Sequence, residues 1–144
     1  MTTEQIKKIA WLNRAFYAEK QAKAWLEKQE RDRSYAEQVS KINSGIFSSS
    51  GSSGNSTENA LIQLAETERC TQEKLAELVR IRDEIVQTIE QVDNSDMQSI
   101  LVWKYLNYFT FEQVAEKMHY SVCNVKYKHK SALDKLCIDL HPKT

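Results

Sequence analysis

Apolar side chains recur at helical spacing over the first 43 positions of the chain. The spacing predicts one long amphipathic helix from Thr2 to about Asn43, and Thr2 with Gln5 has the spacing of a capping box at its start. We expect a helix that packs on a partner and not a regular coiled coil, because the stripe loses its register. It runs first through Ile6, Ile9, Leu12 and Phe16, and then out of register through Trp25, Leu26, Tyr35, Val39 and Ile42.

The next periodic segment follows a stretch of different composition. Residues 44–57 are rich in serine and glycine, which predicts a flexible linker long enough to reverse the chain. Helix resumes over about 58–92, with one heptad row at Leu61, Leu75 and Ile89 and a second at Leu64, Leu78, Ile85 and Val92. The sequence thus predicts an antiparallel helical hairpin over 1–92, with basic residues of the first helix near acidic residues of the second. The same rows would serve the interface of a homodimer equally well.

Shorter helices are expected in residues 95–144. Ser95 with Gln98, and Thr110 with Gln113, repeat the capping-box spacing and predict two helix starts. A turn at His119 and Tyr120 is followed by a further helix, capped by Ser121, with an apolar stripe at Val122, Val125, His129, Ala132, Leu133 and Leu136. Two short helices joined by a tight turn predict a helix-turn-helix. The expected fold is all-α, a long antiparallel hairpin followed by a C-terminal three-helix domain.

The segment from about Ile100 to Leu136 carries a recognisable motif. It reads YLN-x-x-T-x-E-x-V-A-E-x-M-x-Y-S-x-x-x-V-K and ends in A-L-x-K-L, and it resembles region 4 of bacterial sigma-70 factors. The whole layout, with a long first helix, a Ser/Gly loop and an acidic heptad helix, resembles small phage late-gene activators of the ArpU and RinA type. The resemblance implies binding to phage or prophage promoter DNA and contact with RNA polymerase.

Two positions depart from that family pattern. His119 stands where the sigma-type turn usually has glycine, a position that often needs positive φ, and histidine is among the residues that tolerate it. Ser131 replaces an arginine that is common in relatives, which removes a phosphate or base contact.

The DNA-facing side of the last helix follows from its geometry. At 100° per residue, the side opposite the apolar stripe carries Cys123, Asn124, Tyr127 and Ser131. Asn124 suits bidentate contact to adenine, and Tyr127 can reach a phosphate or a thymine methyl group. Lys126, Lys128 and Lys130 flank this face as expected phosphate contacts. Asp134 shares the face but lies where the helix is expected to leave the groove.

Charge is distributed unevenly although the net charge is zero. Residues 1–57 carry nine basic and six acidic side chains, residues 58–100 carry four and ten, and residues 101–144 carry seven and four. The middle segment should therefore avoid phosphate, whereas the last segment could approach it.

Several other functions are disfavoured. The three cysteines have no pairing or metal-type spacing, and no targeting or membrane segment is evident, so we expect a cytoplasmic protein. His119 with Cys123, and Cys137 with His141, have i,i+4 spacing but are not expected to converge on a metal. His129 is expected in the core. Because there is no phosphate loop or nucleophile arrangement, we expect neither an enzyme nor a cofactor.

The leading hypothesis is therefore a transcriptional regulator that binds double-stranded DNA through 122–136, with RNA polymerase and a second copy as further candidate partners. One alternative is a small DNA-packaging subunit of a terminase, which would form a closed ring. A second is a protein-interaction module that docks on RNA polymerase without binding DNA itself.

Overall fold

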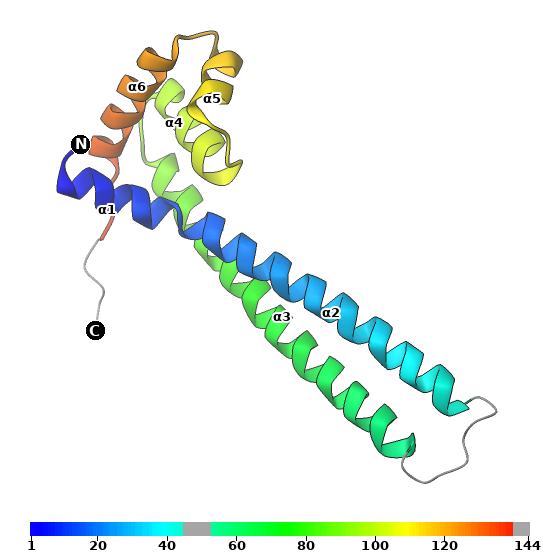
Figure 1. Cartoon of the computed structure of the whole chain (residues 1–144). Coiled ribbons are helices and arrows are strands. Elements are labelled where there is room, and N and C mark those ends of the chain that lie inside the picture. Colours follow the sequence, from blue (N-terminus) through cyan, green and yellow to red (C-terminus); the bar gives the residue numbers. More distant parts are fainter. Residues whose placement is uncertain (45–52, 140–144) are drawn as a thin grey trace. The chain divides into compact units, whose positions relative to one another are not determined.

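A computed structural model describes residues 1–44 and 53–139, and in these ranges every regular element is a helix (Figure 1). The predicted all-α fold is confirmed. The elements are α1 (Thr3–Leu12), α2 (Arg14–Ser44), α3 (Ser53–Glu90), α4 (Ser95–Leu101), the π-helix η1 (Val102–Leu106), α5 (Phe111–Met118) and α6 (Val122–Lys135).

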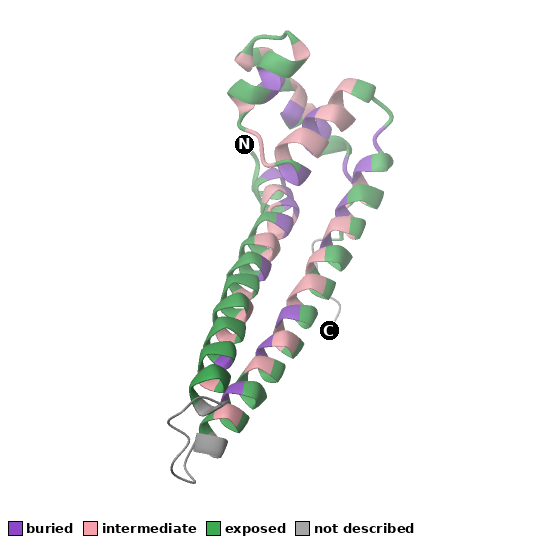
Figure 2. Ribbon diagram, turned by 90° about the vertical axis from the view of Figure 1, so that its right-hand side faces the viewer, coloured by how far each residue is buried: buried purple, intermediate pink, exposed green. Residues whose placement is uncertain are grey.

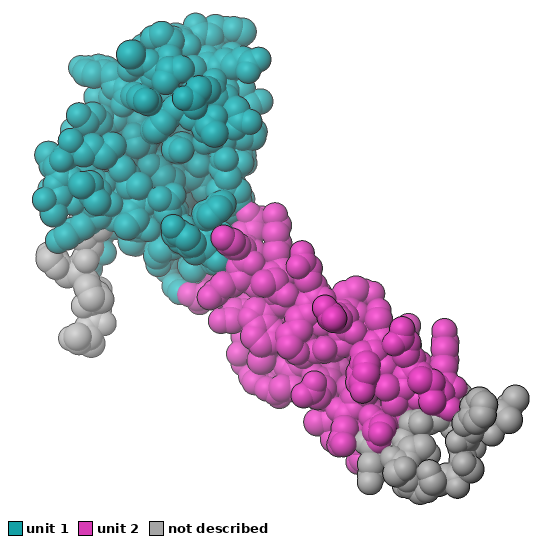
Figure 3. Space-filling view, viewed as in Figure 1, with its two compact units in different colours: residues 1–18, 78–144 teal, residues 19–77 magenta. Residues whose placement is uncertain are grey.

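The helices form two compact units, drawn in different colours in Figure 3. Unit 1 contains residues 1–18 and 78–144, and unit 2 contains residues 19–77. The sequence suggested a division between 92 and 95. The compact units instead meet in sequence after residues 18 and 77, because α1 and the last turns of α3 pack with the short helices.

Unit 2 is an antiparallel pair formed by α2 and α3, which lie side by side (Figure 1). The Asp32 carboxylate accepts a hydrogen bond from Thr67 Oγ1 at 2.6 Å, and Arg33 pairs with Glu68 at 3.6 Å. The predicted pairing of basic residues on the first helix with acidic residues on the second is therefore confirmed.

The buried seam of unit 2 is made of small side chains and not of leucines. Leu61, expected on a packed heptad row, is 53% exposed. The seam runs instead through Thr67 and Thr71, which hydrogen-bond to the Asp32 carboxylate and the Trp25 carbonyl of α2. The buried positions, purple in Figure 2, are Ala22, Ala36, Ala60, Thr67 and Thr71.

Two predicted boundaries are wrong. The first helix is interrupted at Asn13, which has φ −70° and ψ −6°, and the Arg14 Nε donates to the Trp11 carbonyl at 3.0 Å. A side chain that takes a carbonyl from the helical ladder is a known cause of such breaks. The second helix begins at Ser53, so 53–57 is helix and not linker, because extending an existing helix adds a hydrogen bond per residue. Residues 45–52 of the predicted linker lie outside the described residues.

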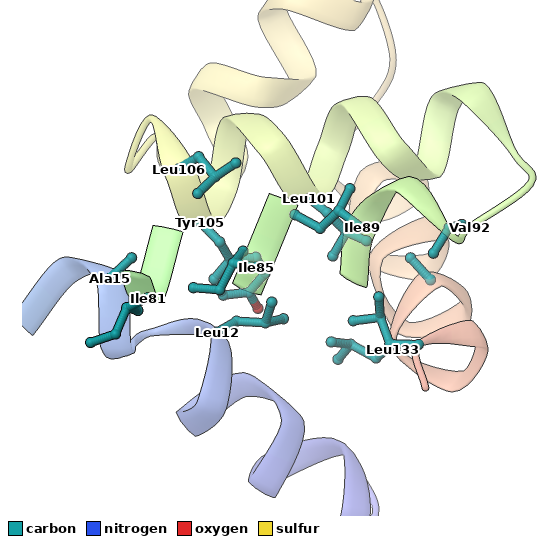
Figure 4. Close-up of a cluster of buried hydrophobic side chains, with 12 residues drawn as sticks. Leu12, Ala15, Ile81, Ile85, Ile89, Val92, Leu101, Tyr105, Leu106 and Leu133 are labelled. Carbon is teal, nitrogen blue, oxygen red and sulfur yellow. The ribbon is translucent and has the colours of Figure 1, made fainter. Parts of the chain in front are cut away.

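The main core of unit 1 joins segments that are distant in the sequence (Figure 4). Leu12 and Ala15 meet the last turns of α3, η1 and the inner face of α6. The labelled side chains converge on one another in that view. They are Leu12, Ala15, Ile81, Ile85, Ile89, Val92, Leu101, Tyr105, Leu106 and Leu133.

The face that α1 buries is more polar than the stripe predicted. Gln5 and Lys8 are each 6% exposed, whereas Ile6 is 56% and Phe16 is 43% exposed. Lys8 is buried because its Nζ donates to the Leu133 carbonyl at 2.8 Å, near the end of α6. The last carbonyls of a helix lack intrahelical partners, so a buried end of this kind needs a donor.

The start of α4 also differs from the prediction. Its cap is Asn94, whose side chain accepts from the Met97 amide at 3.1 Å, and not Ser95. Gln98 turns back and donates to the Glu90 carbonyl at 3.2 Å and to the Val92 carbonyl, so it satisfies the end of α3. The following π-helix, in which the Asn107 amide reaches the Val102 carbonyl at 3.1 Å, was not predicted.

Candidate nucleic-acid interface

The first helix of the helix-turn-helix is α5, and its limits follow from local sequence. Thr110 and Gln113 form the predicted capping box, with Thr110 Oγ1 accepting from the Gln113 amide at 3.2 Å. Val114 and Ala115 are buried against Ile100 and Val125. The short Ala115 side chain allows α5 and α6 to approach each other, so the hairpin-like turn between them stays tight.

The turn depends on a left-handed residue at His119. Its φ is 60° and its ψ is 37°, as the comparison with the usual glycine suggested. The Tyr120 amide then donates to the Ala115 carbonyl at 3.1 Å, which closes the end of α5.

His119→Gly should raise the free energy of unfolding by about 1 kcal/mol, because a residue with a Cβ atom is strained in this region of φ. Glu116→Gly, at an exposed helical position of α5, is the matched control and should lower it by a similar amount. Chemical denaturation of both variants gives the two differences. A fall in stability for His119→Gly would contradict the assigned role of the turn.

The helix α6 has the buried stripe that its sequence predicts. Ser121 caps it through a hydrogen bond from the Asn124 amide to Ser121 Oγ at 3.1 Å. The inner face is buried at Val125, His129, Ala132, Leu133 and Leu136, and Val122 is half-buried. This stripe is held by both core clusters of unit 1, so the direction of the opposite face is fixed.

His129 is a core residue, as predicted, and is 2% exposed. Its Nε2 shares a hydrogen bond of 2.6 Å with the Tyr105 hydroxyl, and the Phe111 ring meets it edge-on at 5.0 Å between centroids. Burial, with a smaller contribution from the Lys104 charge, lowers the pKa of His129 to about 4. Burial likewise raises the pKa of Tyr105. Both groups are therefore neutral near pH 7, and they join η1 to α6 without a buried charge.

The predicted site residues on the outer face of α6 are accessible. Tyr127 is the most prominent and is 72% exposed. Cys123, Lys126 and Lys130 are also exposed, and Asn124 and Ser131 are half-buried. None of these lies in the core clusters, so the side chains form one accessible surface on unit 1.

Lys128 differs from the other predicted site lysines. Its Nζ lies 3.5 Å from Asp96 Oδ2, and the Tyr120 hydroxyl donates to the same oxygen at 2.9 Å. The Asp96 carboxylate raises the pKa of the Tyr120 hydroxyl, chiefly through this hydrogen bond. The ammonium group is thus already paired with the start of α4, and a phosphate would have to compete with Asp96 for it.

The first turns of α1 lie beside the outer face of α6. Gln5 Nε2 donates to Asp134 Oδ1 at 2.8 Å. The sequence placed Asp134 on the outer face of α6. In the structure its carboxylate accepts this hydrogen bond from α1. An open groove follows this contact, and its lining residues are Met1, Thr2, Gln5, Tyr127, Lys130, Ser131 and Asp134.

Comparison with known families adds one finding. Residues 41–137 match the profile of a family described as a protein of unknown function (DUF1492). The chain belongs to the DUF1492 family. The DUF1492 match includes α3, α4, η1, α5 and α6, and so contains the whole helix-turn-helix, whereas α1 lies outside it. Searches of curated proteins and of solved structures each find no match.

Sequence reasoning missed two parts of this surface in the DUF1492 chain. It did not foresee that Gln5 and Lys8 hold α1 against α6, because polar residues on a helix usually face solvent. It also did not include Lys104, whose Nζ lies 4.5 Å from the centre of the Phe111 ring. The only available signal for Lys104 was the positive charge of the last segment.

In 1–44 and 53–139, no group of three or more His, Cys, Asp and Glu side chains is placed to hold a metal ion. His141, considered above with Cys137, lies outside these ranges. No helix in the described part of the chain has a stretch both long and apolar enough to cross a membrane.

Proposed function

We propose that this chain is a DNA-binding transcriptional regulator and not an enzyme, of phage or prophage origin, that acts in the cytoplasm through a sigma-70 region 4-like helix-turn-helix. The observation that carries the proposal is the exposed outer face of α6 around Tyr127, opposite a stripe fixed by two core clusters. A rigid helix with an accessible polar face, preceded by a short helix and a tight turn, has the form that enters a major groove.

The roles of the side chains follow from their chemistry. Asn124 offers both a donor and an acceptor to the edge of an adenine, and Tyr127 reaches a phosphate or a thymine methyl group. Lys126 and Lys130, exposed at the sides of α6, neutralise backbone phosphates and fix the register of the helix on the duplex. Cys123 and Ser131 complete the surface that faces the bases.

The number of phosphate contacts for one copy is small. Lys128 is paired with Asp96, and Ser131 stands where the sigma-type pattern commonly has an arginine. Because each neutralised phosphate contributes to both affinity and salt dependence, a single copy should bind weakly. Useful affinity then comes from a second copy or from RNA polymerase bound at the same site.

The test uses DNA selected by the full-length protein from a random duplex pool, with and without RNA polymerase. Asn124→Ala and, with Tyr127 on a thymine methyl group, Tyr127→Ala should each lower the preference for the selected sequence over random DNA by about fivefold or more, because a lost base contact costs about 1–3 kcal/mol. Tyr35→Ala, which removes a tyrosine of unit 2 that is 58% exposed, is the matched control and should leave the preference unchanged. If the first two variants keep the wild-type preference, the recognition surface is wrongly assigned.

A further inference from the structure

Two lysines from different helices share one aromatic ring at the side of the helix-turn-helix. Lys104 of η1 places its Nζ 4.5 Å from the centre of the Phe111 ring, and Lys126 of α6 places its Nζ 5.8 Å from the same centre. Phe111 is the first residue of α5 and packs against the smaller core cluster of unit 1. Three elements of unit 1 therefore meet at this point.

Several other cations of unit 1 have anionic or carbonyl partners. Arg14 pairs with Glu84 at 2.8 Å, Lys128 with Asp96 at 3.5 Å, and Lys8 donates to a carbonyl. For Lys104 and Lys126, no carboxylate within 4.0 Å is found in the described part of the chain. The attraction of a ring for each cation is worth only about 0.5–1 kcal/mol, and it does not neutralise the charge. A bound anion would neutralise it.

The ring also limits the freedom of both side chains. Both ammonium groups lie at the ring, with Lys126 exposed and Lys104 half-buried, so they lose less freedom when they bind than unrestrained lysines would. The carboxylates of α5, Glu112 and Glu116, are exposed and make no ion pair with either lysine. The start of α5 at Phe111 is therefore a basic surface that can bind an anion with regularly spaced charges.

We propose that Lys104 and Lys126 together bind the phosphate backbone of duplex DNA at the edge of α5. This inference rests on the proposed function and adds Lys104 as an anchor that lies outside the recognition helix. The pair binds phosphate without reading sequence, and it fixes the position in the groove from which Asn124 reads a base. The ligand class is a run of phosphodiesters on one strand.

A purely structural role for the two lysines predicts a different result. If their contacts with Phe111 only support the fold, their loss lowers thermal stability and leaves the salt dependence of binding unchanged. A phosphate site predicts instead that the salt dependence of binding changes, because each lost phosphate contact reduces the slope of log K against log salt by about 0.9.

The experiment measures binding of the full-length protein to its selected duplex and to random DNA between 50 and 200 mM salt. Lys104→Gln and Lys126→Gln should each reduce the salt slope by about 0.9, and the double variant should reduce it by about twice that amount. Both DNAs should lose affinity by the same factor. Lys135→Gln removes an exposed lysine near the end of α6 and is the matched control, which should keep the wild-type slope.

The outcomes separate the two proposals. A double variant with the wild-type salt slope overturns the phosphate site, even if its melting temperature falls. An effect of Asn124→Ala on sequence preference would still support the proposed function in that case. A wild-type protein that binds neither DNA overturns both. If the glutamine variants do not fold, Lys104→Met with Lys126→Met removes the same two charges and keeps an apolar stem over Phe111: a wild-type slope overturns the inference, and a slope lower by about twice 0.9 supports it.

Discussion

Replacing Leu133 by alanine should lower the free energy of unfolding by about 2–5 kcal/mol, the usual cost of removing a fully buried leucine. Leu133 is 0% exposed and lies on the inner face of α6, where it meets residues of α1, α3 and η1 (Figure 4). The surrounding helices are tied to one another by the same cluster, so they cannot close the cavity without losing other contacts. Urea denaturation followed by circular dichroism measures the loss.

Tyr127→Ala supplies the matched comparison on the same helix. Tyr127 is 72% exposed on the opposite side, and such surface substitutions usually change stability by about 0.5 kcal/mol or less. The two variants therefore separate the structural face of α6 from its outer face. A loss below about 0.5 kcal/mol for Leu133→Ala, or a loss above about 2 kcal/mol for Tyr127→Ala, would contradict the orientation of α6.

Acidification between pH 6.5 and about 4 should lower the free energy of unfolding by up to about 3 kcal/mol through His129 alone, since a pKa difference of one unit corresponds to about 1.4 kcal/mol. Burial lowers the pKa of His129 to about 4 in the folded state, against about 6.5 in the unfolded chain. The unfolded chain therefore binds a proton that the folded chain does not. Stability is fully present above the unfolded value and is lost as the pH falls towards the folded value.

His129→Gln tests the assignment because glutamine does not titrate in this range. Whatever its stability at pH 7, the variant should show a flatter dependence on pH between 6.5 and 4. Tyr35→Ala, at an exposed position of unit 2, is the control and should keep the wild-type dependence. Equal pH profiles for the His129 variant and the wild type would rule out the buried imidazole as their source.

Local chemistry made several parts of the fold predictable. The two capping boxes, at Thr2 and Thr110, and the cap at Ser121 depend on residues three positions apart, which sequence displays directly. The buried stripe of α6 also follows from its own period. His119 could be expected at positive φ because the turn requires that conformation and histidine tolerates it.

Contacts between distant segments were not predictable by the same rules. The burial of Lys8 depends on the carbonyl of Leu133, 125 positions away in the sequence. The seam of unit 2 passes through Thr67 and Thr71 and leaves Leu61 exposed, and that register depends on how α2 pairs with α3. The π-helix likewise places Tyr105 and Leu106 in a core to which five other helices contribute.

The candidate site was predictable where it lies on one helix and less so where it joins several. Period and capping were sufficient to identify Asn124 and Tyr127 as accessible residues of α6. The pairing of Lys128 with Asp96, and the position of Lys104 over Phe111, depend on how α4, η1 and α5 pack against α6.

The division of unit 1 into two sequence segments has a consequence for how the chain can vary. Residues 19–77 are an insertion between the two sequence segments of unit 1. The entropic cost of bringing the two ends of such an insertion together changes by only about 0.6 kcal/mol when its length doubles or halves. Whole heptads could therefore be gained or lost from α2 and α3 together while the helices around α6 keep their stability.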